Sequence, residues 1–135
     1  MSWRESLVRI ADHEVETLRK RLAEILDRRA ELEMKLVMLA AQTEAELMHA
    51  QRDAEAGWYK AGFLQGVRFR RAEIQAQIEA TVPEEAGARD ALAVAFESLK
   101  KFEHVAETAR VAAVKALAKL ETAALDEMGL RKRVS

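Results

Sequence analysis

The sequence contains no cysteine, one proline and five glycines in 135 residues, and only 5% of the residues are aromatic. The absence of cysteine excludes disulfide bonds, thiolate-ligated zinc and thiol catalysis within this chain. It also fits a reducing cytoplasm. The scarcity of proline and glycine leaves few places where a helix would have to end. So few aromatic side chains are unusual for a globular core and are typical of a long helix or coiled coil.

Neither sign of charge predominates, because 22 basic and 23 acidic side chains leave a net charge of −1. A nucleic-acid-binding protein normally carries a basic excess that neutralises phosphates. We therefore expect no nucleic acid partner. The stretch from Met1 to Ile10 lacks the apolar core of a secretory signal, and no run approaches the roughly 18 apolar residues that span a bilayer. We expect a cytoplasmic protein without direct membrane insertion.

Strong helix formers dominate what is present. Alanine, leucine, glutamate, lysine and arginine lose little side-chain freedom in a helix. In the first third of the chain, apolar residues recur at alternating steps of three and four, and Arg29 occupies the one missing position. This spacing predicts a helix that packs along its length against a partner helix. The residues of this seam are Val15, Leu18, Leu22, Ile25, Leu32, Leu36 and Leu39.

Two interruptions follow the seam. Gly57, Gly62 and Gly66 weaken the helical pattern, and Pro83 cannot continue a preceding helix, although it fits the first turn of a new one. The sequence thus predicts a first helix over about 5–80, either continuous or broken near 57–66, a second helix over about 84–128 and a basic tail over 129–135. The predicted fold is a single all-α domain, a long antiparallel two-helix coiled-coil hairpin. We expect residues near 10–50 to lie alongside residues near 90–130, with 55–82 at the far end.

The sequence offers little that resembles catalytic chemistry. Glu46 and His49 have the Glu-x-x-His spacing that ferritin-like di-iron bundles use twice, but it occurs once here. His13 and His104 each follow or precede a glutamate directly in sequence, and adjacent residues on a helix do not face each other. We therefore expect no enzyme activity, no catalytic residues, no metal site and no cofactor. A di-iron bundle is the catalytic alternative.

One group near the presumed far end combines aromatic and aliphatic side chains. It consists of Trp58, Tyr59, Phe63 and Val67. These residues could form the core of a bent tip. They could equally anchor a partner protein, because tryptophan and tyrosine dominate binding hot spots. The sequence leaves both alternatives open.

Four short segments, in their order along the chain, resemble the FliJ family, the small coiled-coil proteins of the flagellar type III export apparatus. Leu7–Val15 is similar to the family's opening helix, and Leu36–Leu39 to its Leu-x-x-Leu step. Phe96–Leu99 resembles the aromatic-x-x-Leu element of the last helix. Leu125-Asp126-Glu127, before the basic tail, resembles the family's terminal signature.

The resemblance implies a non-catalytic stalk. Such proteins enter the hexameric export ATPase with their terminal helices, meet the cytoplasmic domain of the export gate with the other end, and handle export chaperones. The implied location is cytoplasmic, peripheral to the inner face of the cell membrane. The ATPase-binding residues would be Leu7, Ile10, Leu125, Asp126 and Glu127. The gate-binding residues would be Trp58, Tyr59, Phe63 and Val67. The alternatives are a stalk of a virulence type III system and a purely structural coiled-coil dimerisation protein.

Overall fold

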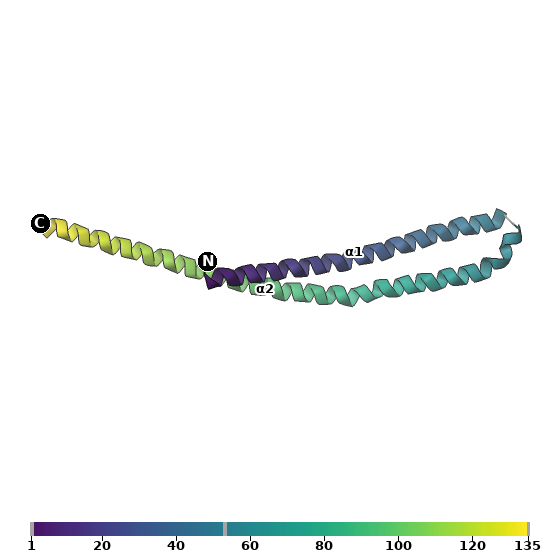
Figure 1. Cartoon of the computed structure of the whole chain (residues 1–135), viewed down its shortest axis with the longest axis horizontal. Helices are drawn as coiled ribbons and strands as arrows, with labels where there is room; N and C mark the ends of the chain where they lie inside the picture. Colours follow the sequence, from purple (N-terminus) through teal and green to yellow (C-terminus); the bar gives the residue numbers. More distant parts are fainter. Residues whose placement is uncertain (1, 53, 135) are drawn as a thin grey trace. The chain divides into compact units, whose positions relative to one another are not determined.

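The computed structural model describes residues 2–52 and 54–134, and for 54–56 the backbone alone. Helix α1 covers Trp3–Arg52, a short 3-10 helix, η1, covers Ala54–Tyr59, and helix α2 covers Lys60–Val134 (Figure 1). The described residues contain no strand. The prediction of an all-α chain with two long helices is therefore confirmed. The predicted basic tail continues α2 as far as Val134, and Ser135 lies outside the described residues.

Helix α1 begins where its first residues can satisfy the free N–H groups of a helix end. The backbone N–H of Glu5 donates to the Ser2 hydroxyl at 3.2 Å, and the N–H of Ser2 donates to Oε2 of Glu5 at 3.3 Å. This reciprocal arrangement is a capping box, which supplies partners to two donors that the helix itself leaves unpaired. The Glu5 carboxylate also complements the positive end of the helix dipole.

The turn between the two long helices lies earlier than predicted. Helix α1 ends at Arg52, and α2 begins at Lys60 and passes through Pro83 without interruption. The predicted helix bounds of 5–80 and 84–128 were therefore wrong. The alternative of a break near 57–66 lies closer to the observed turn, because Gly57 is in η1. Gly62 and Gly66, however, lie inside α2. Asp53, within the predicted first helix, lies outside the described residues.

Burial on both sides of Pro83 explains why α2 continues through it. A proline inside a helix costs about 3 kcal/mol, because it removes one backbone hydrogen bond and its ring meets the preceding turn. Thr81 and Ala88 are only 2% and 1% exposed. Packing of a buried face contributes more to a helix in a protein than local preference does. The tertiary contacts around Pro83 therefore override the local signal that predicted a turn.

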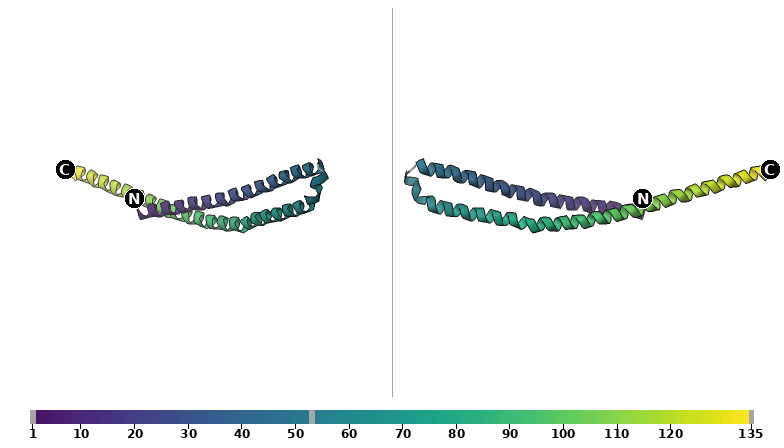
Figure 2. Two further views of the ribbon diagram at one scale, coloured as in Figure 1. Left: turned by 45° about the vertical axis from the view of Figure 1, so that its right-hand side comes forward. Right: turned by 180° about the vertical axis from the view of Figure 1, so that it is seen from behind.

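The chain consists of two compact units. The hairpin unit comprises residues 17–92. In it, α1 and α2 lie side by side and antiparallel in every view (Figures 1 and 2). A narrow row of apolar side chains forms its core, and its buried members are Ile25, Leu32, Leu39, Val67 and Ala88. Within this unit the predicted seam of α1 is buried at Ile25, Leu32 and Leu39 and half-buried at Leu18, Leu22 and Leu36. Its partner here is 60–92 rather than 90–130, and the predicted pairing with 90–130 holds only for the start of α1, which shares a unit with 93–134.

The terminal unit consists of the described residues 2–16 and 93–134. Its buried side chains are Ala11 and Val15 from α1, and Ala95 and Leu99 from α2. Neither described α-helix contains a stretch with the length and hydrophobicity that crossing a bilayer requires.

Candidate interaction surfaces

The last part of α2, residues 112–134, consists only of exposed residues, and we call it the C-terminal arm. In Figures 1 and 2 the yellow end of α2 runs on past the start of α1, and no other helix of the described terminal residues lies beside it. At a rise of 1.5 Å per residue, the arm is about 35 Å long. Most of the stability of a helix in a protein comes from packing of its apolar face, so a partner that covers this arm would stabilise it.

The start of α1 fixes where this arm begins. Trp3 and Leu7 line a hollow with Phe102 and Val105 of α2. The first turn of α1 also borders a groove that reaches Arg110. Beyond this level α2 has no helix of its own chain against it within the described part of the terminal unit.

The apolar stripe of α2 does not end beside the start of α1. Within the terminal unit it passes through Ala95, Leu99, Phe102 and Ala106, which face α1 or border it. At the same steps of three and four residues it continues through Ala113, Leu117, Leu120 and Ala124. Leu117 is 58% exposed and Leu120 is 68% exposed. The arm therefore presents the same kind of seam as the packed part of the helix, without a partner.

The structure separates the predicted ATPase-binding residues into two groups. Leu7 is half-buried and Ile10 is exposed on α1, whereas Leu125, Asp126 and Glu127 are exposed on the arm. Leu7 lies level with Phe102, so it is about 35 Å from Leu125 along the helix axis. Glu127 also forms an ion pair, 3.1 Å long, with Arg131 one turn further on. These five residues could contact one large partner, but they do not form one cluster.

The aromatic group beside the turn is partly exposed. Trp58 is 86% exposed and meets Tyr59 edge to face, with ring centroids 6.0 Å apart. The Tyr59 hydroxyl donates a hydrogen bond to Oε1 of Glu46 at 2.9 Å, which ties the turn to α1. Phe63 is half-buried, but Val67 is 5% exposed and belongs to the core. Val67 is therefore removed from the candidate surface, which keeps Trp58, Tyr59 and Phe63.

The Glu46–His49 pair has a structural partner on one side. Glu46 accepts the Tyr59 hydroxyl, and His49 is exposed. Among the side chains of residues 2–52 and 57–134, no three potential metal-ligating groups come together.

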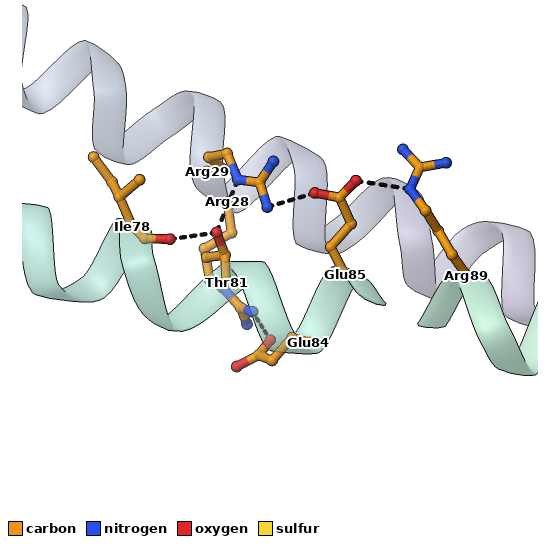
Figure 3. A network of polar contacts seen from close by, with 7 residues as sticks. All are labelled: Arg28, Arg29, Ile78, Thr81, Glu84, Glu85 and Arg89. Atoms are coloured by element: carbon orange, nitrogen blue, oxygen red, sulfur yellow. Dashed lines mark hydrogen bonds and ion pairs between the residues drawn. The ribbon is translucent and has the colours of Figure 1, made fainter. Parts of the chain in front are cut away.

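A polar cluster in the hairpin unit, which we call the Arg29 cluster, was not predicted from the sequence (Figure 3). It consists of Arg29, Thr81, Glu85 and Arg89. The Nε of Arg29 donates to the Thr81 hydroxyl at 2.8 Å, and its Nη2 lies 2.6 Å from Oε1 of Glu85. The Thr81 hydroxyl in turn donates to the carbonyl of Ile78 at 2.6 Å. The one signal for it in the sequence was an arginine at a position of the apolar seam.

Glu85 is the acidic member of the cluster and is held ionised by its neighbours. Its pKa lies below the usual range, first because Arg89 donates a hydrogen bond to it and then because Arg29 does. The Arg89–Glu85 distance is 2.7 Å. One arginine comes from α1 and the other from α2, so the carboxylate joins the two helices.

Comparison with known proteins identifies close relatives of the whole chain. Two flagellar FliJ proteins of Caulobacter vibrioides, from strains NA1000 / CB15N and ATCC 19089 / CIP 103742 / CB 15, are each 52% identical over 130 residues. The match covers 96% of this chain and 94% of each relative. No family model matches the sequence, and no solved structure matches it.

Proposed function

The chain belongs to the FliJ family, and on that premise we propose that it is a non-catalytic stalk of the flagellar type III export apparatus. In this role it binds the hexameric export ATPase at one end and the cytoplasmic domain of the export gate at the other, and it handles export chaperones. It works in the cytoplasm, peripheral to the inner face of the cell membrane, to which the apparatus holds it.

The C-terminal arm is the observation that supports this proposal best. It carries an apolar stripe in register with a packed seam, and it lies outside the described helix pair. Leucines exposed at helical spacing leave apolar surface in contact with water. Binding of a partner that removes this surface from water is favourable. A protein that worked only as a closed hairpin would have no use for such an extension. A partner that surrounds one helix would cover it.

The dimensions of the arm also suit a central position. A single helix with its side chains is about 10–12 Å wide, and a second packed helix adds about 8–10 Å. The chain thus offers a narrow one-helix tip followed by a wider two-helix segment. A ring could admit the first and stop at the second, which would set how far the stalk enters.

The aromatic group beside the turn suits a different kind of contact. Trp58 is exposed while Tyr59 is fixed by its hydrogen bond to Glu46. An exposed tryptophan beside a tyrosine that a hydrogen bond already holds in place can bind a partner with a small loss of conformational freedom, and such residues serve as anchors. With Phe63 beside it, this pair forms the proposed gate-binding surface.

The test is the activity of the cognate export ATPase with and without the purified chain. We expect the chain to raise ATP hydrolysis and to promote ring assembly, and the charge reversals Asp126→Lys and Glu127→Lys to weaken both effects. Phe63→Ala should leave both effects intact and reduce binding to the gate domain. The proposal would be contradicted if the rate of ATP hydrolysis were the same without the chain, with the wild-type chain and with the charge-reversal variant.

A further inference from the structure

The outer face of α1 in the hairpin unit changes character along the helix. Residues two positions apart on a helix differ by about 200°, so Met34 points away from the buried Leu32. On this outward face Lys20 and Asp27 are exposed and charged. From Met34 to Met48 the same face is apolar. We call this surface the methionine stripe, and it consists of Met34, Val37, Met38, Ala41, Ala45 and Met48.

The stripe has the spacing and exposure of an unoccupied helix-packing surface. Met34, Met38, Ala41, Ala45 and Met48 follow one another at alternating steps of four and three residues. Such a repeat places side chains along one line that a second helix can follow. Met34 is 59%, Val37 63%, Met38 53% and Met48 51% exposed. The opposite face of α1 is the one that packs against α2, so the stripe is not part of the core of the described hairpin unit.

Charge at the edges of the stripe indicates what would cover it. Glu33 and Glu44 border one edge, and Glu31 borders the other together with Lys35. All four are exposed. In an antiparallel pair of two copies packed through the same stripe, the edge that carries Glu33 and Glu44 would face its own copy, and this repulsion disfavours self-pairing. A helix with an apolar face and basic edges would instead meet complementary charge.

We propose that the methionine stripe binds a basic amphipathic helix of a partner protein, at a surface separate from the C-terminal arm and from the aromatic group at the turn. Methionine is unbranched and polarisable, so a surface rich in it adapts to apolar faces of different shapes. The stripe therefore suits a partner helix defined by its pattern of charge and hydrophobicity more than by one fixed sequence. This proposal does not depend on the proposed stalk function.

The test uses two synthetic helical peptides that share one leucine face. One carries lysines at the edges of that face and the other carries glutamates. Binding of each fluorescently labelled peptide to the full chain is measured by fluorescence anisotropy. We expect the lysine peptide to bind and the glutamate peptide to bind at least about tenfold more weakly. Equal binding of the two peptides would overturn the proposal.

A triple variant locates the site. Met34→Gln with Met38→Gln and Met48→Gln keeps unbranched side chains of similar helix preference and removes the apolar surface. We expect it to weaken binding of the lysine peptide by about tenfold or more, with an unchanged thermal unfolding curve because the three side chains are exposed. The corresponding change to leucine, and Val94→Thr at an exposed residue outside the stripe, should leave binding intact. Unchanged binding by the glutamine variant would overturn the proposal.

A second variant separates charge from hydrophobicity. Glu33→Lys with Glu44→Lys should make the glutamate peptide the tighter ligand, because the edge charge is reversed. An unchanged preference would show that the edges do not select the partner. Sedimentation of the wild-type chain completes the test: dimers that form at rising concentration and vanish in the glutamine variant would mean that a second copy occupies the stripe, against the proposal.

Discussion

Arg29 of α1 and Thr81 of α2 are joined by a hydrogen bond of 2.8 Å, in which the guanidinium Nε donates to the threonine hydroxyl. Arg29 occupies one position of the predicted α1 seam, and all the other residues of that seam are apolar. A polar residue at one such position can fix which segments pair and in which register, because any shift leaves it without a partner. The Arg29 cluster therefore specifies that α1 pairs with the segment of α2 around Thr81.

Replacing Arg29 should cost more stability than replacing its neighbour. Arg29→Ala leaves the buried Thr81 hydroxyl without its donor and removes one of two arginines from Glu85, so we expect the free energy of unfolding to fall by about 1–3 kcal/mol. Arg28→Ala is the matched control. Arg28 pairs with Glu84, and both side chains are about half exposed, so this change should cost less than about 1 kcal/mol. Urea denaturation measures both, and equal losses would count against the role of the cluster.

The pH dependence of stability should carry the signature of Glu85. Its folded-state pKa is lowered, chiefly by the hydrogen bond from Arg89, so the unfolded chain binds a proton at higher pH than the folded chain does. The contribution of Glu85 is therefore fully present above the unfolded pKa and is lost as pH falls through the folded pKa. We expect Glu85→Gln to reduce this acid-side loss in urea denaturation from pH 7 down to acidic pH. A variant with the same acid slope as wild type would contradict the assignment.

Pro83 offers a direct test of where the chain turns. Inside a continuous helix, Pro83→Ala restores a backbone hydrogen bond and relieves the ring contact, so we expect a gain of about 1–3 kcal/mol in the free energy of unfolding. A proline that began a second helix would gain little from the change, because that position suits it. The thermal midpoint of the variant measures the gain. A midpoint unchanged or lowered would favour a turn at Pro83 over the one beside Tyr59.

The sequence predicted the helical class and the seam, but not the turn. The periodic spacing from Val15 to Leu39 is a local property, and the structure buries Val15, Ile25, Leu32 and Leu39 as expected. Pro83 is also a local signal, yet the burial of Thr81 against α1 overrides it. That burial depends on which segments meet in three dimensions, which no window of sequence contains. The error at the turn then displaced most of the predicted pairing: residues 17–52 lie beside 60–92, and only the start of α1 shares a unit with 93–134.

The candidate surfaces were predicted in the same uneven way. The sequence left open whether Trp58 packs in a core or anchors a partner, and its high exposure favours the anchor. Val67, in contrast, is in the core. Leu125 and its two acidic neighbours were placed near the end of the chain, but the lack of a partner helix beside them follows only from where α1 begins. The unpartnered arm therefore depends on the position of the turn, which the local signals in the sequence placed too late.

Removing the C-terminal arm should leave the fold of the rest intact. Residues 112–134 are all exposed, so a chain that ends at Val111 loses little buried surface. We expect its helicity per residue and its thermal midpoint to stay close to those of the full chain, because stability follows buried apolar area. Circular dichroism measures both. A large drop in the midpoint would show that the arm belongs to the core after all.

The most direct test of the stalk function is the rate of ATP hydrolysis by the cognate export ATPase, measured with equal amounts of the full chain and of the chain that ends at Val111. The account predicts that the full chain raises the rate and that the truncated chain, although folded, does not. A folded truncated chain that stimulates the ATPase as strongly as the full chain would contradict it.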